Sequence, residues 1–374
     1  MADAEPQTFR RSTRDPGVLQ RRMRDWVATR LPEGANPDVS EVTNPSATGM
    51  SSETLLFEAS WIEDGKRHAH ALVARLAPDP ADEPVFPVYD LEMQYRVMEL
   101  VAARSRVPAP PLRWLELDAT HLGAPFLVMD RLEGRVPGDN PPYAMAGWLV
   151  EADAADRKRL QDASVGVLAD LHAIDVGAVD TDFLEFDLPG DTPMRRHFEN
   201  QRRYHAWASR GRSFPVIERS FAWLEANWPE QEGPTVISWG DSRVGNIMYD
   251  GFAPKAVFDW EMAGLAPRGV DVGWMVFMHQ FFEDILQNLL DHASLPDFLR
   301  REDVAAEYAR RSGHDLPDLP FYEVYAALRH GIIMTRITTR SVHFGESEWP
   351  EDADACIPHR GILERMLDGS YWAS

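Results

Sequence analysis

Apolar and polar positions divide the chain into two stretches of different pattern. From Val42 to Leu132, short apolar runs are broken by turn residues, which is typical of a sheet. The runs Leu55 to Trp61 and His68 to Leu76 flank the pair Asp64-Gly65, which is common in tight hairpin turns. This pattern predicts two antiparallel strands joined by a hairpin.

A helix and another strand are expected in the same stretch. Tyr89 to Ala103 carries apolar residues three to four positions apart, the spacing of a helix with one buried face. Ala124 to Met129 is a compact apolar run and predicts a strand. Residues 1–40 are rich in Arg, Asp and Pro, with one amphipathic helix near Val18 to Leu31, and are expected to form an N-terminal extension.

Beyond Gly134 the pattern is mainly helical. Helices are predicted at Ala154 to Ile174, Ser213 to Trp228 and Pro320 to Ile337. Short strands are predicted at Thr235 to Trp239, Ile247 to Tyr249 and Ala256 to Phe258. The predicted fold class is therefore α+β, with a small β-rich N-lobe over residues 41–132 and a larger, mainly helical C-lobe over residues 133–374.

Composition agrees with two lobes and limits the partners. At 374 residues the chain exceeds the size at which one core stops growing. A formal charge of -22 argues against nucleic acid as a partner and would suit a cationic substrate, although acidity also simply keeps a protein in solution. The strongly apolar run Gly273 to Phe282 is half the length that a bilayer needs, so we expect no membrane span. The start of the chain shows no signal-like apolar segment, and Cys356 is the single cysteine, which favours a cytoplasmic location.

The short strands of the second stretch carry the candidate chemistry. If Ile247 to Tyr249 and Ala256 to Phe258 pair as a hairpin, Asn246 and Asp259 come together at its open end. An amide oxygen and a carboxylate suit Mg²⁺, which takes its other ligands from phosphate and water. Asp241, five residues before Asn246, would then face the attacking hydroxyl and accept its proton. Asp-x4-Asn alone is most often a turn, but the order of all the pieces favours a catalytic loop.

This spacing resembles the catalytic loop of kinases, in which an Asp base precedes a metal-binding Asn by five residues and a second Asp follows a strand. The form Trp239-Gly-Asp241, four residues and Asn246 is closer to the aminoglycoside phosphotransferase and choline kinase-like family, near the kinase module fused to some acyl-CoA dehydrogenases. The segment LADLHAID, from Leu168 to Asp175, and Asp271, which matches a carboxylate that braces the loop, support the resemblance. The resemblance implies a bilobal protein-kinase-like fold, ATP and Mg²⁺ as cofactors, and transfer of the γ-phosphoryl group to a small-molecule hydroxyl.

The resemblance also implies phosphate-binding residues in the first lobe. The small-residue loop with Gly49, Ser51 and Ser52 would bring backbone amides to the phosphates, although a plain surface turn fits these residues nearly as well. Arg75 stands where kinases carry a phosphate-binding lysine, and its guanidinium adds a bidentate fork. Gln94 aligns with the helix glutamate that usually pairs with this cation, and its amide oxygen would orient Arg75.

The adenine contacts follow from the same resemblance. Val73 would share a strand face with Arg75 and line the adenine pocket. Met129 would lie behind the base. The carbonyl of Asp130 and the amide of Leu132 would bind its edge, as in the hinge of kinases.

Two residues leave alternatives open. Trp239 replaces the family histidine, and either fills its volume as a loop brace that donates one indole hydrogen bond or marks a degraded active site. Arg243, two positions after the base, either steadies charge on the transferred group or pairs with a neighbouring carboxylate.

The acceptor is open as well. Aminoglycosides, choline-like amino alcohols, sugars and hydroxyacyl thioesters are all candidates, and the first would make the protein an antibiotic-resistance enzyme. Glu283 and Asp284, after the apolar run, could attract a polyamine or form a solvated helix end. A nucleotide-binding scaffold without turnover is the alternative from another class. Nothing in the pattern indicates an oligomeric state.

Overall fold

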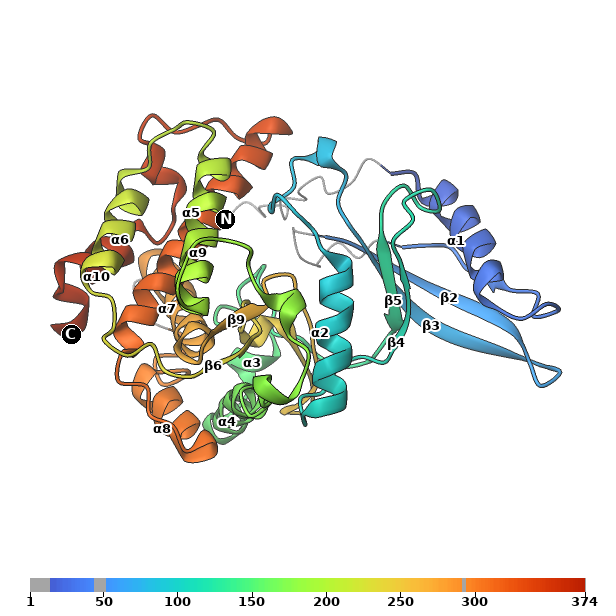
Figure 1. The fold of residues 1–374 in the computed structure, drawn as a ribbon, viewed down its shortest axis with the longest axis horizontal. Coiled ribbons are helices and arrows are strands. Elements are labelled where there is room, and N and C mark those ends of the chain that lie inside the picture. Colours follow the sequence, from blue (N-terminus) through green and yellow to red (C-terminus); the bar gives the residue numbers. More distant parts are fainter. Residues whose placement is uncertain (1–13, 44–51, 291–293, 374) are drawn as a thin grey trace. The chain divides into compact units, whose positions relative to one another are not determined.

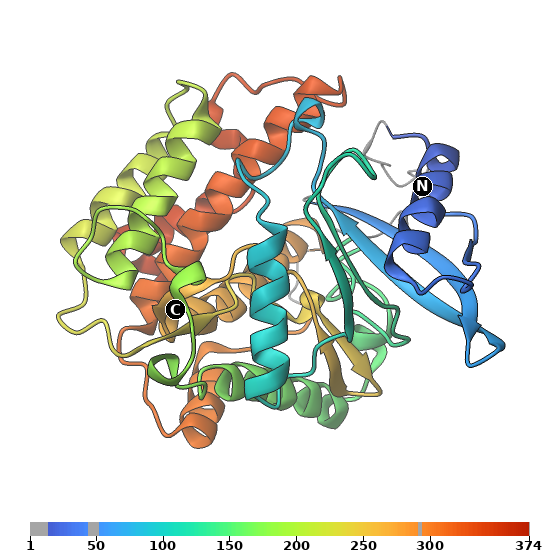
Figure 2. The same cartoon turned by 45° about the vertical axis from the view of Figure 1, so that its right-hand side comes forward.

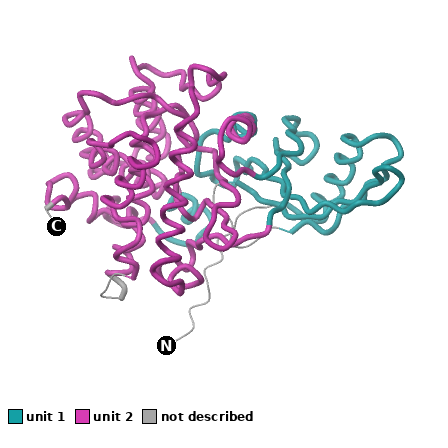
Figure 3. The backbone as a smooth tube through the Cα atoms, turned by 90° about the horizontal axis from the view of Figure 1, so that it is seen from below, with its two compact units in different colours: residues 1–95, 110–132, 337–348 teal, residues 96–109, 133–336, 349–374 magenta. Residues whose placement is uncertain are grey.

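The chain folds into two compact units (Figure 3). The computed structural model describes residues 14–43, 52–290 and 294–373. Unit 1 contains residues 1–95, 110–132 and 337–348, and unit 2 contains residues 96–109, 133–336 and 349–374. Unit 1 is rich in strands and unit 2 is mainly helical, which confirms the predicted α+β class. The boundaries at residues 40 and 132 stay predictions.

The described part of unit 1 is built on an antiparallel sheet in the order β1-β2-β3-β5-β4. Its strands are β1 (Asp38–Val39), β2 (Glu53–Glu63), β3 (Lys66–Leu76), β4 (Leu112–Glu116) and β5 (Phe126–Asp130). The predicted hairpin is confirmed, because Glu63 pairs with Lys66 across a two-residue turn. Asp64 and Gly65 both have positive φ, at 49° and 74°, as a turn that follows the right-handed strand twist requires.

Helix α1 (Pro16–Arg30) packs on one face of this sheet, as Figures 1 and 2 both show. Its residues Leu19, Met23 and Trp26 are buried in one cluster with Phe57 and Phe126 of the sheet. Asp15 caps the helix, because its carboxylate accepts a hydrogen bond from the Val18 amide at 2.8 Å. The segment that the sequence analysis set apart as an extension therefore supplies part of the core of unit 1.

Strand β3 presents its side chains alternately to the two faces of the sheet. Leu72, Ala74 and Leu76 belong to the core beneath α1. Val73 and Arg75 consequently lie on the opposite face, as predicted. Helix α2 (Leu91–Arg104) follows β3 after the short turn Pro80–Asp82, close to the predicted bounds.

Unit 2 surrounds two small sheets with helices. The helices are α3 (Trp148–Glu151), α4 (Ala154–Leu171), α5 (Pro193–Ser209), α6 (Pro215–Ala226), α7 (Gly269–Leu290), α8 (Arg301–Ser312), α9 (Leu319–His343, whose last turns belong to unit 1) and α10 (Arg360–Asp368). One sheet pairs β6 (Thr235–Ser238) with β9 (Gly264–Pro267), and the other pairs β7 (Ile247–Asp250) with β8 (Ala253–Val257). The three helices predicted in this unit are present, whereas β9 was not foreseen. In the described part of the chain, no helix has the length and apolarity to cross a bilayer.

Candidate active site

The β7-β8 hairpin brings the two predicted metal ligands to one end, as expected. Ile247 pairs with Val257, and the Phe258 amide donates to the Asn246 carbonyl at 2.9 Å, which continues the pairing by one step. Asn246 therefore directly precedes one strand and Asp259 follows the other. Asp259 has φ of 58°, a left-handed conformation that is uncommon outside glycine and frequent at functional sites.

The carboxylate of Asp241 is held from both sides. The Trp274 indole Nε1 donates to Oδ1 at 2.7 Å, and the Asn246 amide Nδ2 donates to Oδ2 at 2.7 Å. Asn246 Nδ2 also donates to the Asp241 carbonyl at 3.0 Å. Since both partners are acceptors, the nitrogen of this amide must face Asp241, and its oxygen points elsewhere. The predicted base and the predicted metal ligand are thus locked together.

Gly240 is required by the backbone of this loop. Its φ is 88°, and a Cβ at this position would lie 2.1 Å from the Met262 carbonyl oxygen. A larger residue would therefore force the loop away from the segment before β9. This close approach explains the glycine before Asp241.

Asp271, near the start of α7, braces the strand end and the loop. Its Oδ1 accepts from Ser238 Oγ at 2.8 Å and from the Gly240 amide at 2.9 Å. Its Oδ2 accepts from the Trp239 amide at 2.8 Å and faces His172 Nε2 at 3.0 Å. This arrangement agrees with the bracing role that the family resemblance implied.

The charge of Asp271 is stabilised although the side chain is fully buried. Burial opposes ionisation, but the hydrogen bond and charge of His172 and the loop amides outweigh it and lower the pKa of Asp271. His172, from the predicted LADLHAID segment, is itself oriented by the Tyr308 hydroxyl, 2.8 Å from Nδ1. The brace therefore extends from α7 through α4 to α8.

Trp239 acts as a brace within the loop. Its side chain is completely buried, and its indole Nε1 donates to the Phe258 carbonyl at 2.8 Å and to the Asp259 carbonyl at 3.2 Å. Its ring lies 5.9 Å from that of Trp260. The indole thus ties the loop that carries Asp241 to the strand end that carries Asp259, as the structural interpretation of this residue predicted.

Arg243 pairs with carboxylates, which was one of the two roles considered for it. Its Nη1 lies 2.6 and 2.7 Å from the two Asp139 oxygens, and its Nε lies 3.3 Å from Asp241 Oδ1. Burial alone would lower its pKa, but the carboxylates of Asp139, Asp241 and Asp259 raise it above the ordinary value. Arg243 therefore stays charged beside the proposed base.

Sequence reasoning missed three residues around Asp241. Trp274 follows Asp271 by three positions on α7, so the two share a helix face, and this spacing was a usable signal. Arg329 interrupts an apolar run of α9. It donates to the Gly240 carbonyl at 2.9 Å and lies over the Trp274 ring at 4.5 Å. Asp139 lies in an irregular loop and left no signal.

Glu283 and Asp284, which were considered as polyamine ligands, have structural contacts instead. Glu283 accepts from the amides of Ser294 and Leu295 at 2.9 and 3.0 Å. Asp284 pairs with Arg365 at 3.2 Å. The expectation of a solvated helix end is wrong, because both residues lie inside α7, which continues to Leu290, and Glu283 is buried.

Several of the nucleotide-binding candidates of unit 1 share one face of the sheet. Val73 is opposite Met129 in the β3-β5 register, and both are buried. Arg75 is half-buried, and its Nε donates to Ser52 Oγ at 3.1 Å. Gly49 and Ser51 lie outside the described residues.

The other candidates of unit 1 have partners of a different kind. Asp130 holds Arg113 in a bidentate pair at 2.6 and 3.1 Å, and its amide donates to the Pro111 carbonyl, while Leu132 follows just beyond β5. Gln94 is buried on α2, and among the described residues its Nε2 has no hydrogen-bond partner. The expected hydrogen bond from the Arg75 guanidinium to the Gln94 amide oxygen is not among the contacts between the described residues.

The fold has close counterparts among solved structures. A protein of Ralstonia eutropha that has been assigned as an aminoglycoside phosphotransferase superimposes with a TM-score of 0.65, 22% identity, and coverage of 96% of this chain and 98% of that one. Aminoglycoside phosphotransferase APH(4)-Ia, in a ternary complex with AMP-PNP and hygromycin B, superimposes with a TM-score of 0.54 and 13% identity over 93% of this chain and 98% of that one. At these identities the likeness shows the fold, and it confirms the predicted kinase-like architecture.

Curated relatives carry the same segment within longer proteins. The probable acyl-CoA dehydrogenase IBR3 of Arabidopsis thaliana is 23% identical over 319 residues, which are 80% of this chain and 37% of that protein. Acyl-CoA dehydrogenase family member 11 of Mus musculus is 22% identical over 289 residues, which are 75% of this chain and 34% of that protein. The chain therefore spans about a third of the length of these relatives.

The model of the phosphotransferase enzyme family matches residues 51–313. This range includes β2 and β3 of unit 1 and the whole of the catalytic loop, with Asp241, Asn246 and Asp259. It leaves out the whole of α9 and α10. The match confirms the resemblance inferred from the loop, and the chain belongs to the phosphotransferase enzyme family.

Proposed function

We propose that the protein transfers the γ-phosphoryl group of ATP to a hydroxyl group of a small molecule. The observation that carries the proposal is the fixed carboxylate of Asp241, held by Trp274 Nε1 and Asn246 Nδ2 at 2.7 Å each. A carboxylate oriented in this way accepts a proton from a hydroxyl within hydrogen-bonding reach. Phosphoryl transfer needs little more from a protein than positioning and neutralisation of charge.

The side chains around Asp241 have distinct tasks in this proposal. Asp241 orients the acceptor hydroxyl and takes its proton as the new P–O bond forms, and ADP leaves. Arg243 keeps a positive charge beside the transferred group, and Asp139 fixes the guanidinium. In unit 1, Arg75 binds phosphate oxygens, and Val73 and Met129 line the adenine.

The residues at the end of the hairpin fit a magnesium ion. Within the described residues no cluster of three or more His, Cys, Asp or Glu side chains could hold a metal. Mg²⁺ bound to a nucleotide needs only one or two protein oxygens, because phosphates and water complete its octahedron. The Asn246 amide oxygen, turned away from Asp241, and the Asp259 carboxylate supply these oxygens. The ion would neutralise phosphate charge when bound.

The neighbour with the same fold supports the choice of substrates. APH(4)-Ia binds AMP-PNP, an ATP analogue, together with hygromycin B, a small molecule with hydroxyl groups. We therefore assign ATP and a hydroxyl-bearing small molecule to this chain as well.

The decisive experiment measures ADP release by the wild-type protein with ATP and magnesium. Aminoglycosides, amino alcohols and hydroxyacyl thioesters serve as acceptors, and mass spectrometry detects the phosphorylated product. We expect acceptor-dependent ADP release with at least one class. ATP binding without transfer to any class would favour the alternative of a nucleotide-binding scaffold.

The role of Asp259 is tested by nucleotide binding. Asp259→Ala should weaken Mg-ATP binding more than binding of metal-free ATP, because the carboxylate acts on the phosphates only through the cation. Equal losses in both titrations would indicate a folding defect in place of a metal ligand.

For the acceptor we propose an amine-bearing alcohol of the aminoglycoside type. The support is the neighbour's ligand and the net charge of -22, which would concentrate a polycation near the protein. Since the Debye length is about 8 Å at ~0.15 M salt, affinity for a polycationic acceptor should fall clearly between ~0.05 and ~0.5 M salt. A neutral acceptor should show little change.

The dehydrogenase relatives favour a second acceptor, a hydroxyacyl thioester. In those proteins the matching segment is about a third of a longer chain named for acyl-CoA chemistry. A best substrate that is anionic would replace the aminoglycoside proposal and would leave the phosphotransferase assignment unchanged.

A further inference from the structure

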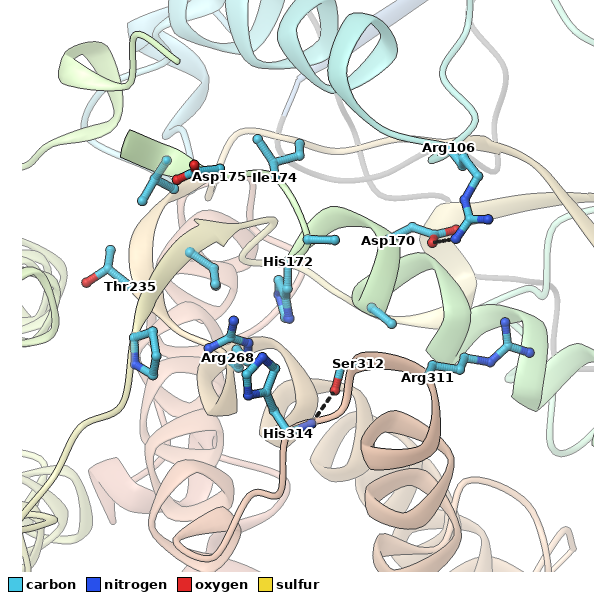
Figure 4. A pocket seen from close by; sticks show the side chains of 15 residues that line it. Arg106, Asp170, His172, Ile174, Asp175, Thr235, Arg268, Arg311, Ser312 and His314 are labelled. Atoms are coloured by element: carbon cyan, nitrogen blue, oxygen red, sulfur yellow. Dashed lines mark hydrogen bonds and ion pairs between the residues drawn. The ribbon is translucent and has the colours of Figure 1, made fainter. Parts of the chain in front are cut away.

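A cavity of about 600 Å³ opens in unit 2 on the far side of the catalytic-loop brace. It is formed where the end of α4, the turn that follows it, the start of β6 and the end of α8 meet (Figure 4). The lining side chains that bear on its chemistry are Arg106, Asp170, His172, Arg268, Arg311 and His314. The cavity has the volume of an ordinary small-molecule site.

The described lining carries more arginine than carboxylate. This is unusual in a chain with 38 Lys and Arg against 60 Asp and Glu. Asp170 is paired with the exposed Arg106 at 2.7 Å, and Asp175 Oδ1 accepts from the Gly177 amide at 3.0 Å. Asp170 is thus paired with Arg106, and no ion pair joins Asp175 to Arg268 or Arg311 among the contacts of the described residues.

Arg268 and Arg311 supply the positive charge. Arg268 Nε is buried and has no hydrogen-bond partner among the described residues. Arg311 shares the Glu307 carboxylate with Arg310, so one negative charge serves two guanidinium groups. Figure 4 shows Arg268 beside the rings of His172 and His314, whereas Arg311 extends away from them toward α4, where its guanidinium approaches Gly166.

A neighbouring hollow is less favourable for an anion than this cavity. That hollow shares Pro234, Arg268 and His314 with the cavity, and its other lining residues include four carboxylates, Glu230, Glu232, Asp315 and Asp318. An anion would be repelled there and attracted on the side of Arg311.

We propose that this cavity binds a small anion that carries a phosphate group, at a site separate from the catalytic loop. Guanidinium groups bind phosphate oxygens through paired, charge-assisted hydrogen bonds, which fits Arg268 and Arg311 better than it fits a neutral ligand. The proposal goes beyond phosphoryl transfer and does not depend on it.

The cavity is connected to the catalytic loop by a row of contacts. His172 lines the cavity and faces Asp271 at 3.0 Å, and Asp271 accepts from the Trp239 and Gly240 amides. Tyr308 contacts the other nitrogen of His172 at 2.8 Å. Burial raises the pKa of Tyr308, and the nearby positive charge of Arg268 opposes that rise. An anion on Arg268 changes the field at Tyr308 and His172, and so reaches the brace of the loop.

Calorimetric titration with inorganic phosphate, pyrophosphate and phenyl phosphate tests the site directly. We expect saturable binding of at least one probe to the wild-type protein. Arg311→Gln should weaken it by about tenfold, the loss of one charge-assisted hydrogen-bonding group. The three probes distinguish a free phosphate from a phosphate ester.

Arg310→Gln is the matched control. Arg310 is on the same helix and pairs with the same Glu307, but it does not line the cavity. Because this variant leaves Glu307 to Arg311 alone, it should weaken binding less than Arg311→Gln does. Arg268→Gln is a second test variant, and circular dichroism confirms that each variant is folded.

Three results would overturn the proposal. They are absence of saturable binding for all probes, an equal loss in Arg310→Gln and Arg311→Gln, and binding that Arg75→Met abolishes while Arg311→Gln preserves it. The last result would place the anion at the nucleotide phosphates.

The contact between the cavity and the loop at Trp239 and Gly240 can be tested without measuring enzyme turnover. Hydrogen exchange of the Trp239 and Gly240 amides, which donate to Asp271, should slow when the probe is bound. The change should be absent in Arg311→Gln. Unchanged exchange at saturating probe would show that the site does not influence the loop.

Discussion

The catalytic loop of unit 2 and the proposed nucleotide-binding face of unit 1 hold their candidate residues in different ways. In the loop, side chains fix one another: Trp274 and Asn246 hold Asp241, and Asp271 holds the backbone at Trp239. In unit 1, Val73 and Met129 hold their places because their strands are paired. Substitutions should therefore be felt more strongly in the loop than in the sheet.

The largest effect is expected from Asp241→Ala. Loss of the base and of its positioning should lower turnover by about 10²–10⁴-fold, while ATP affinity stays within a few-fold of wild type. Steady-state kinetics and nucleotide titration measure the two quantities. Asp250→Ala, an exposed carboxylate in the turn of the same hairpin, is the control and should retain activity. Wild-type turnover in Asp241→Ala would remove this residue from the mechanism.

Substitutions of Trp239 test whether the stability of the loop depends on the volume that this buried side chain fills. Trp239→Ala should lower the free energy of unfolding by about 3–5 kcal/mol, because a fully buried side chain leaves a cavity. Trp239→His restores the family-like residue and should change activity only modestly. Urea unfolding and ADP release separate the two outcomes. An inactive wild type together with an active histidine variant would mean that Trp239 disables the enzyme.

Asp271 tests the charge of the brace. In Asp271→Asn an NH₂ group must face either the Trp239 amide or the Gly240 amide, both of which are donors. We expect a loss of about 1–3 kcal/mol in unfolding free energy at neutral pH. Glutamine is too long to serve as a matched replacement, so wild type is the reference.

The stability difference between wild type and Asp271→Asn should depend on pH in a defined direction. The folded-state pKa of Asp271 is lowered, so its stabilisation is present above the unfolded pKa of about 4 and is lost as pH falls through the folded value. The difference between wild type and Asp271→Asn should therefore shrink below about pH 4. A difference that stays constant with pH would show that the charge is not what matters.

Trp274→Phe should have a smaller effect, confined to catalysis. The ring volume is largely kept, but Asp241 Oδ1 loses its donor, and we expect kcat to fall by about tenfold with little change in KM for ATP. Trp260→Phe is the control, because its indole donates to the Val257 carbonyl at 3.3 Å and does not contact Asp241. Equal losses in both variants would assign the effect to packing.

The parts of the fold that depend on local pattern could be predicted from the sequence. The pair Asp64-Gly65 indicated a tight turn and hence the first hairpin. The spacing around Asp250-Gly251 indicated a second hairpin, and this predicted that Asn246 and Asp259 lie at its open end. The β9 strand was missed because its four residues, Gly264–Pro267, pair only with a distant strand. The amphipathic helix at α1 was expected, but its packing was missed, because the stripe of Leu19, Met23 and Trp26 does not itself show that it covers the sheet.

The candidate site could be predicted where its chemistry lies in one loop. Asp241, Asn246 and Asp259 are close in sequence, and their spacing carries the signal. From three other elements, Trp274 contacts Asp241, Asp139 contacts Arg243, and Arg329 contacts the Gly240 carbonyl and the Trp274 ring. Their positions depend on how α7, α9 and the loop at residue 139 pack, which no short motif encodes.

Substitution of Arg75 should have the smallest effect on activity of all these changes. It sharpens the comparison between the loop of unit 2 and the sheet face of unit 1. Arg75 is half-buried on a strand, and its guanidinium is partly screened by water, so its contribution to phosphate binding should be about 1 kcal/mol. Arg75→Met should therefore raise KM for ATP by roughly fivefold and leave kcat nearly unchanged, whereas Arg75→Lys should recover part of the loss by restoring the charge without the fork. Steady-state kinetics with varied ATP measures both. A loss of kcat as large as that of Asp241→Ala would mean that unit 1 acts on the transition state through a side chain, and the contrast between the two regions would fail.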